Sequence, residues 1–98
     1  MFFTNTVTLN PGSPPTASEL TSGINTDDRF VLILRVPAGY IASGQSVRIG
    51  GSGVGQSSGY TLDSQASEVT LTVEGAKVYG IIASGSSGIP VDVLAYSA

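Results

Sequence analysis

Cysteine and histidine are both missing from this 98-residue chain. Without cysteine there is no disulfide framework, no thiolate zinc site and no cysteine nucleophile. Without histidine the chain also lacks the usual general base near neutral pH and the commonest metal ligand. These two absences remove the side chains on which many hydrolases and metal sites depend, and they favour a protein that is not an enzyme.

Charged residues are scarce too, at 11% of the chain against about a quarter in an ordinary domain. The four basic residues, Arg29, Arg35, Arg48 and Lys77, are scattered along the sequence, and the formal net charge is −3. A nucleic-acid interface needs clustered basic side chains that release counterions from the phosphates. No nucleic-acid partner is therefore expected.

Long hydrophobic runs are also absent. The longest strongly apolar stretch covers residues 30–34, far short of the roughly 20 residues that span a membrane. The opening MFFTNTVTLN lacks the basic start and the apolar stretch of about 7–15 residues that a signal peptide needs. The sequence therefore indicates no membrane partner.

What the chain does contain is a series of short strand-like segments. In residues 68–74 the apolar Val69, Leu71 and Val73 alternate with polar residues, which is typical of a half-buried strand. Residues 30–34 are apolar on both faces, as a central strand would be. Further candidate strands are 5–10, 45–50, 59–63, 77–83 and 90–96. Their spacing predicts an all-β fold, a small antiparallel β-sandwich or barrel of six to eight short strands.

Two segments between these strands allow more than one local structure. Residues 16–24 follow two prolines and form either a single helical turn or a loop, and the loop is favoured. Residues 84–89, SGSSGI, have the composition of a hairpin loop, which would pair the strands on either side of it.

The N-terminal residues differ in character from the rest and predict an arm over residues 1–16, followed by a single sandwich domain over residues 17–98. The arm begins with Met1, Phe2 and Phe3, large apolar residues at a chain end that is normally frayed. Its second half is rich in proline, which favours an extended chain of low conformational entropy. Such an arm either folds back on its own domain or docks on a neighbouring subunit.

The glycine- and serine-rich stretch 49–63 contains G-x-S-x-G at residues 55–59, which is the nucleophile-elbow pattern of serine hydrolases. An elbow needs a helix after it and a histidine to activate Ser57, but the residues that follow read as a strand and the chain has no histidine. Lys77 is the only lysine, and nothing places it beside Ser57. The P-loop pattern also fails, because no lysine follows these glycines. We interpret the stretch as a connection between two strands, with no catalytic residue.

Three other groups of residues are candidate sites. Asn25, Asp27 and Asp28 could hold calcium, but they lack the glycine and the distal glutamate of an EF-hand loop, so a solvated turn is favoured. Glu68 and Glu74 would lie roughly 20 Å apart along one strand, too far for a glycosidase pair. Two tyrosines beside turns, Tyr40 and Tyr60, could stack on sugars or cover the end of the core. No metal and no cofactor is expected.

The C-terminal half resembles small virion proteins of tailed bacteriophages. In those proteins a strand runs into a Gly-Gly-Ser/Asp-Gly-Val-type loop and then GY-x-L, followed by a strand ending in lYaiaasG and a final V-x-V-L strand. The matching residues here are 47–54, 59–62, 78–85 and 91–94. In the first half, RFVLILRVPAG is similar to the apolar strand and turn that precede the glycine loop in that family.

The resemblance implies a β-sandwich on the outside of a capsid, a decoration (cement) subunit that binds the major capsid protein, with a homotrimer favoured. It transfers no catalytic residue. A neck or tail component of the virion and a carbohydrate-binding module are the alternatives. Deleting residues 1–9 is expected to abolish capsid binding without unfolding the sandwich. The expected capsid-facing contacts lie in the arm and are Met1, Phe2, Phe3, Pro11, Pro14 and Pro15.

Overall fold

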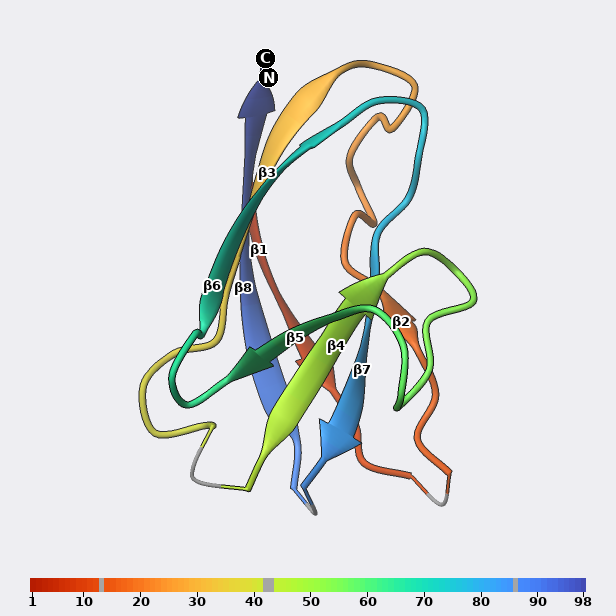
Figure 1. The fold of residues 1–98 in the computed structure, drawn as a ribbon. Helices are drawn as coiled ribbons and strands as arrows, with labels where there is room; N and C mark the ends of the chain where they lie inside the picture. The colour runs from red at the N-terminus through yellow and green to blue at the C-terminus, as the bar shows by residue number, and fades with distance from the viewer. Residues whose placement is uncertain (13, 42–43, 86) are drawn as a thin grey trace.

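The computed structural model describes residues 1–12, 14–41, 44–85 and 87–98, and its strands form two antiparallel four-stranded sheets (Figure 1). Sheet A has the strand order β1-β8-β3-β6, and sheet B has the order β2-β7-β4-β5. The strands of sheet A are β1 (Phe2–Leu9), β8 (Ile89–Ser97), β3 (Phe30–Arg35) and β6 (Glu68–Val73). Those of sheet B are β2 (Ser18–Glu19), β7 (Tyr79–Ser84), β4 (Ser46–Gly50) and β5 (Tyr60–Asp63). The predicted all-β fold is confirmed, and the two separate sheets make it a sandwich.

None of the described residues lies in a helix. Over the same part of the chain, nothing of the length and hydrophobicity of a membrane-spanning helix is found.

The core lies between the two sheets and is built by alternate residues of each strand, because successive side chains of a strand point to opposite faces. In β3 the inward residues Phe30, Leu32 and Leu34 are fully buried. Sheet B contributes Val47, Ile49, Leu62 and Ile82, and β8 contributes Ile89, Val91, Val93 and Ala95. The alternation seen in the sequence is therefore the alternation that fills the core.

Proline lies where a missing N–H breaks no ladder hydrogen bond. Pro37 follows the end of β3, as a residue that cannot donate to the ladder should. Pro90 is inside β8, but the pairing of β8 with β3 stops at Arg35 and Asp92, so no β3 carbonyl faces it. Both positions let the chain leave or enter sheet A without loss of a hydrogen bond.

The structure corrects the expected hairpin at residues 84–89. β7 belongs to sheet B and β8 to sheet A, so the chain crosses between the sheets here. Glycine and serine favour a tight turn, but they do not specify whether the next strand pairs with the last one or lies opposite it. Residues 16–24 contain the short strand β2 followed by a turn closed by the Ile24 N–H and the Thr21 carbonyl at 2.9 Å, so no helix forms.

The structure also differs from the expected arm over residues 1–16. β1 is a strand of sheet A that pairs with β8 along its whole length, from Phe2 opposite Tyr96 to Leu9 opposite Ile89. Both termini meet at one end of the sandwich (Figure 1), where the Met1 ammonium donates to Ser97 Oγ at 2.8 Å. Residues 2–9 of the predicted arm therefore fold back on their own domain.

Candidate functional site: the outer face of sheet A

The outer face of sheet A, the face turned away from sheet B, carries apolar side chains at its centre. The strand register aligns these outward residues in rows across the four strands. One row is Phe2, Tyr96, Val31 and Thr72, the next is Thr4, Leu94, Ile33 and Thr70, and the third is Thr6, Asp92, Arg35 and Glu68. Two apolar rows therefore lie beside one polar row.

The apolar rows are open to solvent. Phe2 is 76% exposed and Tyr96 is 39% exposed, while Ile33 and Leu94 in the next row are half-buried. The two sheets are the only layers that the described strands form, so no third layer covers this face. The solvent face of an antiparallel sheet is normally polar, whereas two adjacent rows of this face hold five apolar or aromatic residues: Phe2, Tyr96, Val31, Leu94 and Ile33. This makes the face the candidate contact surface.

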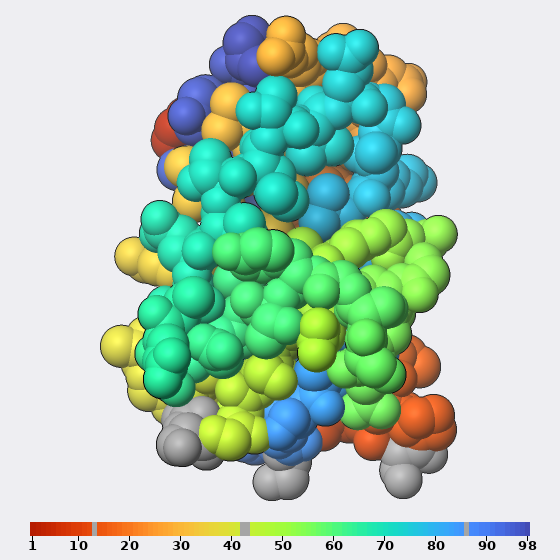
Figure 2. Space-filling view, in the orientation of Figure 1, coloured from red at the N-terminus to blue at the C-terminus, as the bar shows by residue number. Residues whose placement is uncertain are grey.

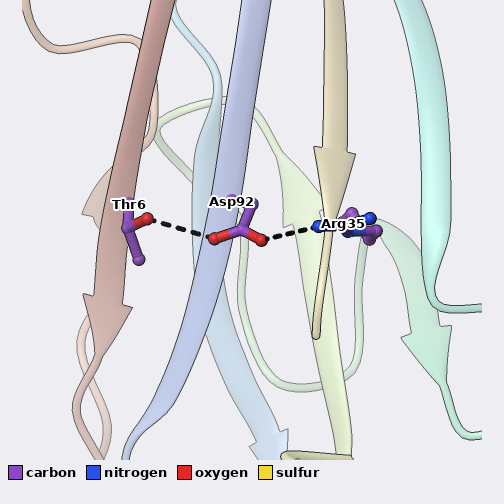
Figure 3. A network of polar contacts seen from close by, with 3 residues as sticks. All are labelled: Thr6, Arg35 and Asp92. Carbon is purple, nitrogen blue, oxygen red and sulfur yellow. Dashed lines mark hydrogen bonds and ion pairs between the residues drawn. The ribbon is translucent and has the colours of Figure 1, made fainter. Parts of the chain in front are cut away.

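The polar row is held together by Asp92. Its Oδ2 accepts from Arg35 Nη2 at 3.1 Å, and its Oδ1 accepts from Thr6 Oγ1 at 3.1 Å. Figure 3 shows the three side chains reaching along the sheet from three neighbouring strands, β1, β8 and β3. The arrangement fixes the Arg35 guanidinium on this face beside Glu68, which lies opposite it in the register.

A shallow hollow of about 540 Å³ joins the polar and apolar rows. Its lining includes Ile33 and Leu94 from the apolar side and Arg35, Asp92 and Glu68 from the polar side. The hollow is wide and open. Its chemistry suits a protruding apolar side chain of a protein partner with a polar neighbour beside it.

The six predicted contact residues are not brought together. Met1 and Phe2 lie exposed at one end of β1, whereas Phe3 points inward, packs against the core and has its ring beside Gly23. The prolines lie beyond the other end of β1, about 23 Å away for a strand of this length. Pro11 and Pro14 are exposed there, and Pro15 is half-buried. Of the six, only Phe2 belongs to the outer face of sheet A.

The glycine-rich stretch forms a structured connection over sheet B. Gln56 donates through Nε2 to the carbonyls of Ile82 and Ala83, at 3.4 and 3.3 Å, next to the point where the β4–β7 register shifts. Arg48 Nη1 donates to the Gly59 carbonyl at 3.3 Å. In Figure 2 the residues of this stretch and of β5 form a band across the middle of the face turned to the viewer. The stretch therefore supplies a donor to the two β7 carbonyls at the irregular part of the β4–β7 ladder.

Nothing in this connection resembles a serine hydrolase site. The segment after it is β5, a strand, where an elbow would require a helix. Lys77 lies with Tyr60 in a second hollow, of about 320 Å³, whose other walls include Val69 and Leu71. Within the described residues, no hydrogen bond or ion pair joins Lys77 to Ser57.

Tyr40 and Tyr60, the candidate sugar-stacking residues, are on different parts of the molecule. Tyr60 begins β5 and lines the second hollow, while Tyr40 lies in a turn in which its N–H bonds the Pro37 carbonyl at 3.3 Å. That turn follows the end of β3 near the other end of β5 (Figure 1). The described hollows therefore include no surface lined by both rings.

The remaining candidates behave as turns or as solvated side chains. Asn25 Oδ1 accepts from the Asp27 N–H at 3.2 Å, and Asn25 Nδ2 donates to Asp28 Oδ2 at 3.3 Å. Among the described residues, no group of acidic side chains is placed to hold a metal ion. Glu68 opens β6 and Glu74 follows its last residue, so the two carboxylates lie at opposite ends of one strand.

Comparison of the chain with protein-family models, with curated proteins and with solved structures found no match. The site therefore rests on geometry alone. Sequence reasoning missed Ile33, Leu94 and Tyr96 as surface residues because each belongs to a strand that reads as core. A signal was present in residues 30–34, which are apolar on both faces in a sandwich where only one face is buried.

Proposed function

We propose that this chain is a structural protein of a tailed-bacteriophage virion, a decoration subunit that binds the outside of the capsid through the outer face of sheet A. The observation that carries the docking role is the apolar part of that face, where Phe2 and Tyr96 are exposed and Val31, Leu94 and Ile33 are half-buried. The virion assignment rests on the resemblance of the C-terminal half to small phage virion proteins. The major capsid protein is the proposed partner, and the proposal includes no catalytic step.

The resemblance involves segments that lie in both sheets. Residues 47–54 form most of β4 and the start of the glycine-rich connection, and residues 59–62 include most of β5. Residues 78–85 contain β7, and residues 91–94 lie in β8. Because β8 carries Asp92 and Leu94 on the outer face of sheet A, the resembling part of the chain includes part of the proposed docking surface.

The chemistry of the face specifies the kind of surface it would bind. Phe2 and Tyr96 are aromatic anchors of the type that dominates the energy of protein interfaces. The polar row adds Arg35, already paired with Asp92, together with Glu68. A partner that fits this face presents apolar side chains toward the two apolar rows and hydrogen-bonding groups toward the polar row.

The test is co-sedimentation of the purified protein with capsid shells of the tailed phage whose genome encodes the chain. Wild-type protein should bind saturably, with a fixed number of copies per capsomer. Leu94→Lys, which places a charge in the apolar centre, should reduce binding at least tenfold. Thr61→Lys provides the matched control, because Thr61 lies on the outer face of sheet B, and it should bind as the wild type does.

Two outcomes would overturn the proposal. Unimpaired binding by Leu94→Lys, with both variants folded by circular dichroism, would show that the outer face of sheet A is not the docking surface. Failure of the wild type to bind the shells would exclude the decoration role, and it would favour a neck or tail component or a glycan-binding module. Incubation with isolated tails and with a glycan array would separate those two.

A further inference from the structure

The free edge of β1 has unpaired backbone groups at alternate residues. The Ser97 N–H donates to the Met1 carbonyl at 3.1 Å, which makes Met1 and Ser97 a hydrogen-bonded pair of the β1–β8 ladder. In an antiparallel ladder hydrogen-bonded and non-hydrogen-bonded pairs alternate. The odd residues of β1 therefore bond β8. The N–H and carbonyl groups of the even residues Phe2, Thr4, Thr6 and Thr8 point away from it.

These outward groups have no backbone partner in the described part of the chain. β1 is the outermost strand of sheet A, and no backbone hydrogen bond from a turn or loop reaches Phe2, Thr4, Thr6 or Thr8. Natural proteins usually protect such edges, because a row of free donors and acceptors is a template for another strand.

The other three edges of the sandwich are protected, and β1 is the exception. β2 has 2 residues and β5 has 4, so each offers little length for pairing. β6 begins at Glu68 and is followed directly by Glu74, so a charge stands at each end of that edge. β1 has 8 residues, FFTNTVTL, with no charge, no proline and an unbroken register against β8.

We propose that the free edge of β1 pairs antiparallel with β1 of a second copy, so that two sandwiches share one continuous eight-stranded sheet. Hydrogen-bonded pairs across the two-fold axis must join residues whose N–H and carbonyl groups point away from β8. When the two β1 strands overlap over their full length, Phe2 lies opposite Thr8 of the partner subunit and Thr4 lies opposite Thr6 of the partner subunit. The two-fold axis passes beside Asn5. This pairing does not depend on the proposed virion role.

The chemistry of β1 suits a copy of itself. Cross-strand threonine pairs stabilise antiparallel ladders, and Thr4 opposite Thr6 occurs twice in this register. The net charge of −3 lies outside β1, so pairing brings no like charges face to face. The outward side chains of β1 belong to the outer face of sheet A, so the pairing would place two copies of that face side by side.

The first test removes one outward N–H. Thr4→Pro deletes a donor that is not used in the β1–β8 ladder, so the sandwich keeps its own hydrogen bonds while the dimer loses two. The matched control is Thr70→Pro in β6. The Val36 N–H bonds the Ser67 carbonyl, so by alternation the Thr70 N–H also points outward, on the opposite edge of sheet A.

Sedimentation equilibrium measures the result. Wild type and Thr70→Pro should be dimers, and Thr4→Pro should raise the dimer dissociation constant at least tenfold. A wild-type monomer or trimer at micromolar concentration would overturn the proposal. So would a Thr4→Pro dimer of unchanged affinity, or a loss of the dimer in a folded Thr70→Pro protein.

A second measurement does not depend on how the proline variants fold. The chain has no cysteine, so Asn5→Cys introduces a single thiol beside the two-fold axis, where the two Cβ atoms would lie at cross-strand distance. Mild oxidation should convert most of this variant to a disulfide-linked dimer. Thr70→Cys, on the opposite edge, should stay monomeric on a denaturing gel. Equal cross-linking of both variants, or none with Asn5→Cys, would contradict the pairing.

Discussion

Arg35 and Asp92 form an ion pair across two neighbouring strands of sheet A, with Nη2 and Oδ2 separated by 3.1 Å. Their side chains are 59% and 35% exposed, so water and salt screen the attraction. The pair therefore contributes little to stability. Its structural effect is to hold the guanidinium on the outer face of sheet A, beside the apolar rows.

The first prediction concerns the energy of that pair. A double-mutant cycle with Arg35→Ala and Asp92→Ala should give a coupling free energy of about 0.2–1 kcal/mol, because exposed pairs rarely exceed this range. Urea unfolding of the four proteins at low and high salt measures it, and the coupling should fall as salt rises. A coupling above about 2 kcal/mol that is insensitive to salt would mean that the pair is shielded from water.

The second prediction separates two adjacent phenylalanines. Phe2 is 76% exposed, so Phe2→Ala should change the free energy of unfolding by no more than about 0.5 kcal/mol. Phe3 packs against the core and beside Gly23, so Phe3→Ala should cost about 1–3 kcal/mol. Denaturant unfolding of both variants measures this, and equal effects would contradict the placement of β1. In the capsid assay the order should reverse for folded protein, with Phe2→Ala binding more weakly.

The fold was predictable because its signals are local. Alternation at Val69, Leu71 and Val73 and the apolar stretch 30–34 both correspond to observed strands, β6 and β3. The pairing of strands was not predictable in the same way. The sequence of residues 84–89 is compatible with a return to the same sheet or a crossing to the other, and only the packing of the two sheets decides between them.

The site was less predictable than the fold, because it depends on which face of a strand is covered. Met1, Phe2 and Phe3 read as one apolar group, but strand alternation sends Phe3 to the core and Phe2 to the outer face. Leu9 is fully buried at the other end of β1, so deletion of residues 1–9 would remove core side chains as well as a strand. The expectation that the truncated chain stays folded is therefore at odds with the structure.

The third prediction tests the glycine-rich connection. Gln56→Ala removes the amide that donates to the Ile82 and Ala83 carbonyls, and it should cost about 1 kcal/mol in the free energy of unfolding. Ser57→Ala changes the adjacent residue and should leave stability within about 0.5 kcal/mol of the wild type. Thermal and urea unfolding compare the two. A larger loss for Ser57→Ala than for Gln56→Ala would contradict the role given to Gln56.

The last prediction distinguishes glycines that the fold requires from glycines that it tolerates. Gly59 has a φ of +99°, and a Cβ there would lie 2.6 Å from the Ile49 carbonyl oxygen and 2.8 Å from Val54. Gly59→Ala should therefore cost at least about 2 kcal/mol, from the left-handed conformation and from the clash with backbone. Gly53 has open space at the corresponding position, so Gly53→Ala should be neutral or slightly stabilising, by up to about 1 kcal/mol. Urea unfolding of the two variants gives the comparison. Equal tolerance of both substitutions would mean that the connection from β4 to β5 is looser than the structure shows. Arg48 would then lose its fixed acceptor at the Gly59 carbonyl.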